Sequence, residues 1–260
     1  MNNIYISFTC IPSRIKNLPY IINYIFKQTL KFNKLIINYP KRVLRLNIDS
    51  DIDLVNDIIS KSQYNKNIYL NITDDYGPIT KIYPLIHLDF INPNDNIIII
   101  DDDNHYNYNL FQRLYTEFMK TNNTVICVSG LLYPTKLNSP YYCCRPGSYC
   151  QLIEAAFGYI IKRNFLDDDL NKWVIKANNF DEIKKENFFN SFLSDDYIIS
   201  RYFDKKNIQK KVINYTTELS KSNTFIKDKD IKGTDSLCSL GHNLDKYVKS
   251  EIELKIKKLV

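Results

Sequence analysis

Four consecutive isoleucines, Ile97–Ile100, run directly into three consecutive aspartates, Asp101–Asp103. An unbroken run of branched aliphatic residues is typical of a strand that is buried on both faces, as in a parallel sheet. Ligands of open α/β sheets bind just beyond the carboxyl ends of the strands. The stretch therefore predicts a central strand that ends in a cluster of negative charge, here called the acid triplet, at the edge where ligands bind.

The acid triplet indicates a divalent-cation site, because adjacent carboxylates repel one another and stay ionised together only near a cation or in good contact with water. Carboxylate oxygens suit Mg²⁺ or Mn²⁺, and Mg²⁺ usually binds through one or two carboxylates plus substrate phosphates. Strand alternation would place Asp101 and Asp103 on one face and turn Asp102 away. Two other interpretations remain open: a solvated acidic turn, and a Ca²⁺ loop, although the Gly and terminal Glu of an EF-hand are missing.

Strand and helix patterns alternate around this run. Strand patterns occur at 4–9, 35–38, 68–72, 97–100 and 125–128, and helical patterns lie between them at 17–25, 51–60, 80–88 and 109–120. This order predicts an α/β fold with right-handed crossovers and helices on both faces of a parallel sheet. After residue 134 the pattern changes. Residues 135–151 are rich in turns and aromatics, 155–161 are expected to return to the sheet, and helices are expected at 190–203 and 244–259.

Composition limits the classes of function. The 260 residues, 44% hydrophobic and 25% charged, are ordinary for a globular protein. The net charge of +6 favours anionic ligands without requiring nucleic acid. No apolar run approaches the roughly 18 residues of a membrane span, and no basic region precedes the first strand as in a signal peptide. The six cysteines are too scattered for a disulfide framework. We therefore expect a soluble cytoplasmic or other intracellular protein, of open oligomeric state.

Three segments resemble glycosyltransferases of the GT-A fold. They are the acid triplet, read as an Asp-x-Asp motif, the first loop Thr9–Arg14, and the segment Asp74–Lys81 just upstream of the triplet. The resemblance implies a Rossmann-type nucleotide-binding sheet with helices on both faces and a smaller acceptor-side portion. It further implies that residues 1–135 bind a nucleotide sugar, while residues 136–260 of the same compact domain supply the acceptor site and the catalytic base.

For the donor, the resemblance implies a metal ion held by Asp103 and Asp101, which bridges both phosphates and neutralises the leaving nucleoside diphosphate. In the alternative, Asp101 or Asp102 accepts hydrogen bonds from the ribose or the sugar hydroxyls and does not bind the metal. Arg14 and Lys81 are expected to meet the diphosphate or a base carbonyl. The alternative for both cations is an ordinary structural or surface charge.

Further donor contacts are expected around these residues. The first loop, with Thr9 and Pro12, is expected to lie against the nucleotide. Asp75 either holds the donor sugar, orients the lysine six residues further on, or caps a helix. Glu154 is expected to hydrogen-bond the donor sugar, and Gly158 to let the backbone approach it closely.

The second half is expected to supply the base. Asp195 and Asp196, here called the acid pair, resemble the acidic pair of inverting enzymes of this fold. Asp196 is predicted to remove the proton from the acceptor hydroxyl, with Asp195 as its neighbour or as a helix cap. The alternative is a pair of plain helix N-terminal acids. His242 is predicted as a further metal ligand, because neutral imidazole suits Mn²⁺ better than Mg²⁺, or else as a structural histidine.

The leading hypothesis is a metal-dependent hexosyl- or N-acetylhexosaminyltransferase that uses a nucleoside diphosphate sugar. UDP is the carrier expected by analogy, transfer is expected with inversion, and retention stays open. The acceptor would be a glycan, a protein or a small molecule. One rival is a Mg²⁺-dependent nucleotidyltransferase, against which residues 9–16 contain no Gly for a phosphate loop. The other is a non-catalytic glycan- or nucleic-acid-binding module, favoured by 20 tyrosines, although the acid triplet would repel a phosphate backbone.

Overall fold

The structure is a computed structural model, and it describes residues 2–104, 106–137, 142–185, 189–214 and 243–260. His242, predicted as a metal ligand, lies outside these described residues. Among the described helices, none combines the length and the apolar character needed to cross a membrane.

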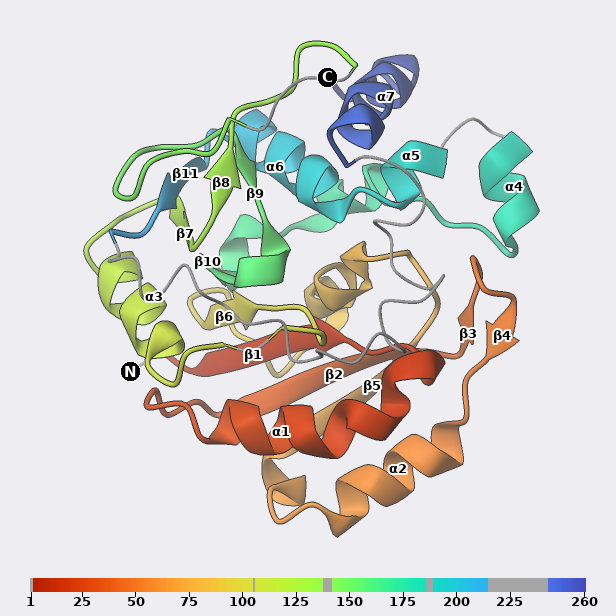
Figure 1. Cartoon of the computed structure of the whole chain (residues 1–260), viewed down its shortest axis with the longest axis vertical. Helices are drawn as coiled ribbons and strands as arrows, with labels where there is room; N and C mark the ends of the chain where they lie inside the picture. Colours follow the sequence, from red (N-terminus) through yellow and green to blue (C-terminus); the bar gives the residue numbers. More distant parts are fainter. Residues whose placement is uncertain (1, 105, 138–141, 186–188, 215–242) are drawn as a thin grey trace.

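One seven-stranded sheet organises the chain, with the strand order β11-β7-β10-β6-β1-β2-β5 (Figure 1). Every neighbouring pair is parallel except those of β10, which runs antiparallel to both β6 and β7. The predicted α/β class with a mostly parallel sheet is therefore confirmed. The bounds of the strands are β1 Ile4–Thr9, β2 Lys34–Pro40, β5 Ile68–Thr73, β6 Asn96–Ile99, β7 Thr124–Cys127, β10 Tyr159–Lys162 and β11 Gln209–Val212.

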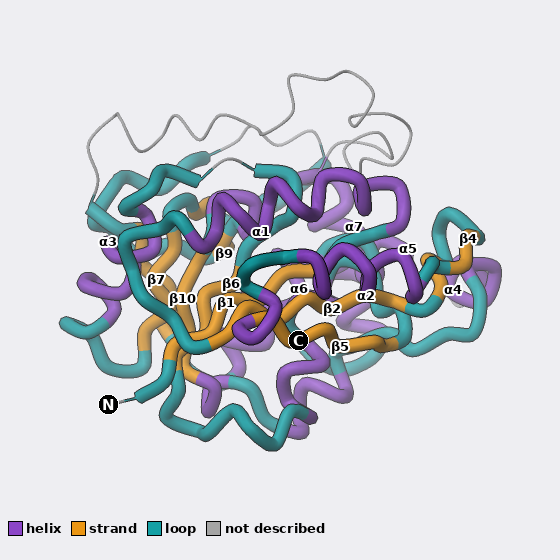
Figure 2. Tube along the Cα trace, turned by 90° about the horizontal axis from the view of Figure 1, so that it is seen from below, coloured by secondary structure: helices purple, strands orange, loops and turns teal. Residues whose placement is uncertain are grey.

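Strands from both predicted halves share this sheet, because β10 and β11 from the second half pair with strands of the first. Two short hairpins accompany it, β3 (Arg42–Val43) with β4 (Ile48–Asp49), and β8 (Gly130–Leu131) with β9 (Leu152–Ile153). Helical segments lie on both sides of the strands (Figure 2). The α-helices are α1 Leu18–Phe26, α2 Ile52–Lys61, α3 Leu110–Phe118, α4 Phe180–Lys185, α5 Phe189–Phe192, α6 Asp195–Lys205 and α7 Asn243–Ile256.

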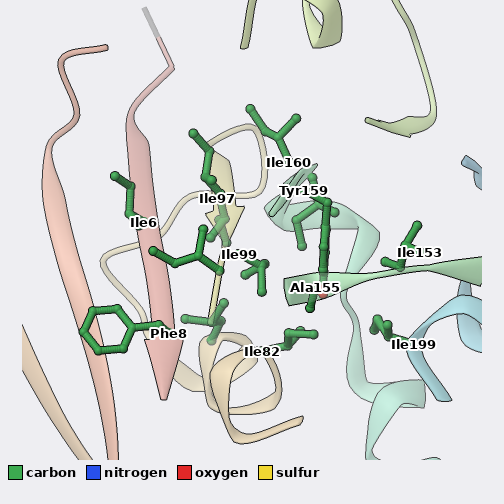
Figure 3. Packing of buried hydrophobic residues seen from close by; sticks show 14 of the residues in the cluster. Ile6, Phe8, Ile82, Ile97, Ile99, Ile153, Ala155, Tyr159, Ile160 and Ile199 are labelled. Carbon is green, nitrogen blue, oxygen red and sulfur yellow. The ribbon is translucent and has the colours of Figure 1, made fainter. Parts of the chain in front are cut away.

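The isoleucine run forms the centre of the core. Ile97–Ile100 are fully buried, and they pack among apolar side chains of β1 and β10 such as Ile6 and Ile160 (Figure 3). A strand covered on both faces needs apolar side chains at every position rather than at alternate ones. The continuous run therefore fixes β6 in the middle of the sheet, and the residues after it at the sheet's carboxyl edge.

Two predicted helices are broken in ways that matter for the site. The stretch 80–88 forms two 3₁₀ helices, Ile79–Lys81 and Tyr83–His87, with Ile82 out of helical geometry between them and Pro84 early in the second. The stretch 190–203 forms α5 and α6, separated by Ser194 in a non-helical conformation. Because of this second break, the acid pair begins a new helix instead of lying inside a longer one.

Candidate active site at the carboxyl ends of the strands

The acid triplet lies just beyond the carboxyl end of β6, beside the end of β1. Ser7 of β1 is in register with Ile99, the last residue of β6, and the Ile100 amide donates to the Ser7 carbonyl at 3.0 Å. The predicted alternation of the triplet is wrong, because the strand ends before it. Asp101 forms an ion pair with Lys81. Asp102 and Asp103 both form ion pairs with Arg14.

Arg14 is the cation shared by the last two acids of the triplet. It lies in a 3₁₀ helix, Pro12–Asn17, which Pro12 begins. Its guanidinium forms an ion pair with Asp102, and its Nη1 lies 3.1 Å from Asp103 Oδ2. The Asp102 carboxylate is the main cause that raises the pKa of Arg14 above its usual value, against the effect of burial. The first loop is therefore held against the acid triplet.

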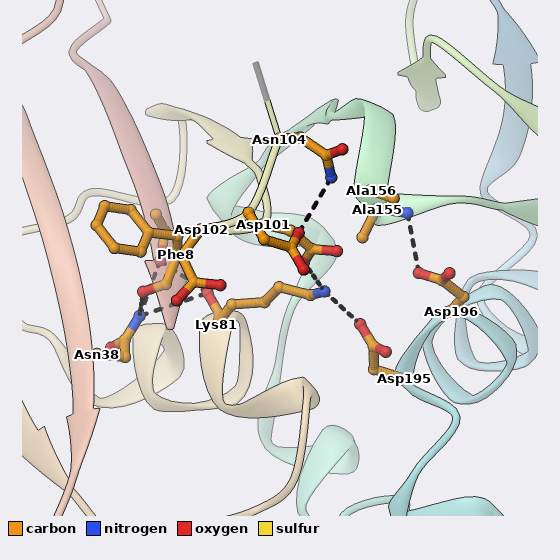
Figure 4. A network of polar contacts seen from close by, with 12 residues as sticks. Phe8, Asn38, Lys81, Asp101, Asp102, Asn104, Ala155, Ala156, Asp195 and Asp196 are labelled. Carbon is orange, nitrogen blue, oxygen red and sulfur yellow. Dashed lines mark hydrogen bonds and ion pairs between the residues drawn. The ribbon is translucent and has the colours of Figure 1, made fainter. Parts of the chain in front are cut away.

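Lys81 is the cation on the other side of the triplet. Its Nζ lies 2.5 Å from Asp101 Oδ1 and 2.8 Å from Asp195 Oδ2, and its side chain is only 3% exposed (Figure 4). Burial alone would lower the pKa of Lys81, but the carboxylates of Asp101 and Asp195 raise it well above its usual value. A single ammonium group thus joins the acid triplet to the acid pair.

The acid pair occupies the first turn of α6, and its two members have different partners. Asp195 binds Lys81, whereas Asp196 Oδ1 accepts a hydrogen bond from the Ala155 amide at 3.0 Å. Burial raises the pKa of Asp195, although Lys81 counteracts it. Burial and the neighbouring Asp195 raise the pKa of Asp196 well above its usual value. A raised pKa makes either carboxylate a better proton acceptor once it is ionised, and Asp195 is already engaged by Lys81.

Whether the site can hold a divalent cation depends on the balance of charge around the acid triplet and the acid pair. The described contacts bring two cations, Arg14 and Lys81, to the five carboxylates of the acid triplet and acid pair. Burial, together with Asp101 and Asp102, raises the pKa of Asp103 to about 6 in spite of Arg14. At 38% exposure, the Asp103 side chain still reaches solvent. The excess negative charge and this access suit an added cation.

No closed metal cage exists among the described residues, since no three His, Cys, Asp or Glu side chains there meet in a ligand cluster. A cation that arrives with phosphates needs only one or two carboxylates from the protein. The acid triplet therefore fits an ion such as Mg²⁺ or Mn²⁺ that is completed by its ligand, and it does not fit a structural metal.

Two buried tyrosines belong to the site and were missed by the sequence reasoning. The Tyr106 hydroxyl lies 3.0 Å from the Asp101 amide nitrogen and 3.2 Å from the Ala156 carbonyl oxygen, so it ties the triplet's backbone to the segment that binds Asp196. The Tyr159 hydroxyl, fully buried, has no hydrogen-bond partner among the described residues. Burial raises the pKa of Tyr159, the positive charge of Lys81 lowers it, and the negative charge of Asp195 raises it.

A ladder of polar side chains under Lys81 was also missed. Asn38 Nδ2 donates to Ser7 Oγ at 2.9 Å, and Asn71 Nδ2 donates to Asn38 Oδ1 at 2.8 Å. Ser7 Oγ in turn donates to the Lys81 carbonyl at 2.7 Å. The available signal was a polar residue within three otherwise apolar strand patterns. A buried polar group needs a partner, and Ser7 and Asn38 share the backbone carbonyl of Lys81 as theirs.

Asp75 and Thr9 make backbone contacts in the structure. The Asp75 carboxylate accepts from the Leu44 amide at 2.7 Å and from the Gly77 amide at 2.8 Å, and burial raises its pKa. Both oxygens are therefore engaged in anchoring loops, and Lys81 takes its orientation from other acids. Thr9 Oγ1 donates to the Asn38 carbonyl at 2.9 Å, which joins the ends of β1 and β2.

Glu154 and Gly158 flank the short 3₁₀ helix Ala155–Phe157. Glu154 accepts from Ser129 Oγ at 2.5 Å, and burial raises its pKa. Gly158 has φ +88, a conformation that L side chains rarely adopt, and a Cβ there would lie 3.5 Å from Ile100 Cγ2. Backbone geometry beside β6 thus already requires a glycine, and the predicted close approach to a donor sugar stays a prediction.

Comparisons with known proteins give a loose structural likeness. The sequence matches no family profile and no curated protein. The structure is similar to a 2-C-methyl-D-erythritol 4-phosphate cytidylyltransferase from Francisella tularensis, with 12% identity over 89% of this chain and 97% of that one and a TM-score of 0.49. It is also similar to a 4-diphosphocytidyl-2C-methyl-D-erythritol synthase, with 10% identity over 92% and 97% of the chains and a TM-score of 0.47.

A third similar structure is S. aureus TarS in complex with UDP, with 11% identity over 83% of this chain and 59% of that one and a TM-score of 0.47. Likenesses this distant do not decide between functions. The fold and the site define an α/β protein whose charged edge lies at the carboxyl ends of its central parallel strands, and the choice of function rests on the side chains at that edge.

Proposed function

We propose that this chain is a divalent-metal-dependent glycosyltransferase that moves a sugar from a nucleoside diphosphate sugar to an acceptor hydroxyl. The observation that carries the proposal is the single ammonium group of Lys81, which binds the acid triplet through Asp101 and the acid pair through Asp195. A solvent-accessible acid cluster suited to a metal and a diphosphate thus adjoins a buried carboxylate suited to proton transfer. Sugar transfer needs both of these functions side by side.

At the donor end, Asp103 and Asp101 are the proposed metal ligands, with His242 as a further one. A bound Mn²⁺ or Mg²⁺ would supply positive charge that offsets the charge of the departing diphosphate. Arg14 holds Asp102 and Asp103 in place through its ion pairs. Thr9, Pro12, Glu154 and Gly158 are proposed to line the nucleotide and the donor sugar.

At the acceptor end, Asp196 is the proposed base. The acceptor oxygen forms a bond to the sugar carbon, the bond from that carbon to the phosphate oxygen breaks, and the acceptor proton moves to Asp196. Burial and Asp195 raise the pKa of Asp196, which makes its carboxylate a stronger proton acceptor than an exposed one. A single displacement of this kind inverts the sugar carbon. We take UDP as the first carrier to test, and a glycan, a protein or a small molecule as the acceptor.

The experiment is a panel of nucleotide sugars with Mn²⁺, scored for release of the nucleoside diphosphate, alongside thermal unfolding with UDP or GDP and with or without Mn²⁺. We expect stabilisation that needs nucleotide and metal together, and release from at least one donor. Asp103→Asn should abolish both the stabilisation by nucleotide with metal and the release of the nucleoside diphosphate. Asp74→Asn is the matched control, because Asp74 lies in the neighbouring loop with its side chain 70% exposed.

The same panel separates the rivals. Release of inorganic pyrophosphate from a nucleoside triphosphate and a sugar phosphate, with no consumption of any nucleotide sugar, would assign a nucleotidyltransferase instead. Stabilisation by an oligonucleotide alone, which weakens as salt is added, would assign a binding module. Either result would overturn the proposed glycosyl transfer.

A further inference from the structure

We propose that Lys81 is a positioning residue, whose ammonium group sets the spacing between the donor end and the base end of the site, rather than a cation that binds the diphosphate. This inference rests on the proposed function, and it differs from the role that the sequence pattern suggests for Lys81. The contacts of this one side chain carry it.

The backbone of Lys81 is fixed before its side chain is considered. The residue closes the 3₁₀ helix Ile79–Lys81, and its carbonyl accepts from Ser7 Oγ at 2.7 Å and from Asn38 Nδ2 at 3.5 Å. Both donors lie within buried strands of the central sheet. The side chain therefore starts from a rigid point on the sheet and reaches outward to the acids at its edge.

The ammonium group has carboxylates on two sides. With Asp101 at 2.5 Å and Asp195 at 2.8 Å, and with 3% of the side chain exposed, Lys81 is a buried bridge between two elements that are 94 residues apart in the sequence (101 to 195). Removing one partner of a buried ion pair leaves an uncompensated charge, which strongly destabilises that arrangement. Without Lys81, Asp101 and Asp195 would repel each other with nothing between them.

A second link between the same two clusters contains no charge. The Tyr106 hydroxyl binds the backbone of Asp101 and of Ala156, and the amide of Ala155 binds Asp196. This second link runs from the Asp101 backbone to the Asp196 carboxylate without a cation, while Lys81 joins the carboxylates of Asp101 and Asp195. Loss of Lys81 should therefore move the acid pair without unfolding the site. A displacement of about 1 Å at a reacting group can cost on the order of 100-fold in rate.

The chain offers a matched control in a second buried lysine. Lys210 of β11 is 2% exposed, forms an ion pair with Asp204 near the end of α6, and lies 3.0 Å from the Ser200 carbonyl. It contacts the same helix as Lys81, but at its middle and its C-terminal end instead of at the acid pair. Lys210→Met thus removes a buried ammonium group that binds Ser200 and Asp204 of α6 instead of the acid pair.

The experiment compares Lys81→Met, Lys81→Arg and Lys210→Met in the full chain. Calorimetry measures the affinity for UDP with Mn²⁺, turnover assays give kcat for transfer, and hydrogen exchange follows residues 194–199. For Lys81→Met we expect affinity within about threefold of wild type, kcat lower by on the order of 100-fold, and faster exchange at 194–199. Lys81→Arg keeps the charge and should recover part of kcat. Lys210→Met should leave kcat and exchange at 194–199 unchanged.

Three results would overturn the inference. A loss of UDP affinity of about tenfold or more in Lys81→Met, with kcat retained, would make Lys81 a diphosphate-binding residue. A wild-type kcat in Lys81→Met would show that Lys81 has no positioning role. Equal slowing of kcat by Lys210→Met would show a general effect of helix stability. Should Lys81→Met fail to fold, Lys81→Arg carries the test, with unchanged affinity and a reduced kcat as the supporting result and the reverse as the contradicting one.

Failure of the proposed function is distinguishable from failure of this inference. If wild-type protein consumes no nucleotide sugar, glycosyl transfer is excluded. Hydrogen exchange at 194–199 still tests Lys81 in that case, because faster exchange in Lys81→Met but not in Lys210→Met supports the bridging role without any turnover, and equal exchange in both contradicts it.

Discussion

The acid triplet and the acid pair are both runs of adjacent aspartates, yet their surroundings differ. The triplet follows a strand, and two of its side chains, Asp101 and Asp103, keep 27% and 38% of their surface exposed. The pair begins a helix, and Asp195 keeps only 10%. Arg14 binds two members of the triplet directly, whereas Asp196 of the pair accepts a hydrogen bond from the Ala155 backbone amide.

The difference teaches how one kind of side chain acquires two chemistries. Carboxylates that reach solvent can replace their bound water with a metal ion at small cost in free energy. A buried carboxylate without a direct cation has its charged form disfavoured, so its pKa rises and it becomes suited to accept a proton. We therefore propose ligand binding for the triplet and proton transfer for the pair, a division of roles that mutation and pH dependence can test.

The largest expected effect is at Asp103. Asp103→Ala should abolish turnover and metal-dependent nucleotide binding while the fold stays intact, because the lost carboxylate belongs to the solvent-facing end of the cluster. Titration calorimetry with UDP and Mn²⁺ measures the binding, and circular dichroism checks the fold. Turnover at the wild-type rate would refute the assignment of the triplet to the metal.

The next effect is at Asp196. Asp196→Asn should leave UDP affinity unchanged and lower kcat for transfer by roughly 100- to 10,000-fold, which is the usual contribution of a general base. Affinity and turnover measured on the same preparation separate the two roles. If transfer persists undiminished, the base lies elsewhere and the pair is a structural feature of α6.

The pH dependence sharpens the same comparison. Burial and Asp195 raise the pKa of Asp196, and a base acts only when it is unprotonated. The kcat for transfer should therefore fall as pH drops through a value above the ordinary carboxylate range of about 4. A pH–rate profile of wild-type protein measures this limb. A limb at about pH 4 would point to a carboxylate with an ordinary pKa as the base.

The strands and the position of the triplet could be predicted from sequence because the signals are local. A run such as Ile97–Ile100 indicates burial on both faces by itself, and β6 ends at Ile99, one residue short of the aspartates, with Ile100 between them. The bridge by Lys81 could not be predicted, since it joins residues 81, 101 and 195 through the tertiary fold. The separation of α5 from α6 at Ser194 also escaped prediction, because the apolar spacing on either side reads as one helix.

Asp75 shows how a local contact can account for a residue that a motif resemblance also selects. Its place in the segment Asp74–Lys81 suggested contact with the donor sugar. A side-chain oxygen two residues before a glycine amide is an ordinary turn contact, and the structure has this contact, at 2.8 Å to Gly77. The second contact, with the Leu44 amide, joins parts of the chain too far apart for spacing to reveal.

The smallest expected effect on activity is at Asp75, which belongs to neither the acid triplet nor the acid pair. Asp75→Asn keeps one acceptor oxygen but turns an amide N–H toward a backbone N–H, so one of the two contacts is lost. Loss of a buried hydrogen bond to a charged group should lower the free energy of unfolding by about 1–3 kcal/mol. Denaturant unfolding measures this change, with the exposed Asp74→Asn as the control expected within about 0.5 kcal/mol of wild type.

Donor KM and kcat of Asp75→Asn should stay within about twofold of wild type, because both Asp75 oxygens already bind backbone. A rise in donor KM of about tenfold with little loss of stability would instead return Asp75 to the donor site and extend the ligand-binding role beyond the triplet.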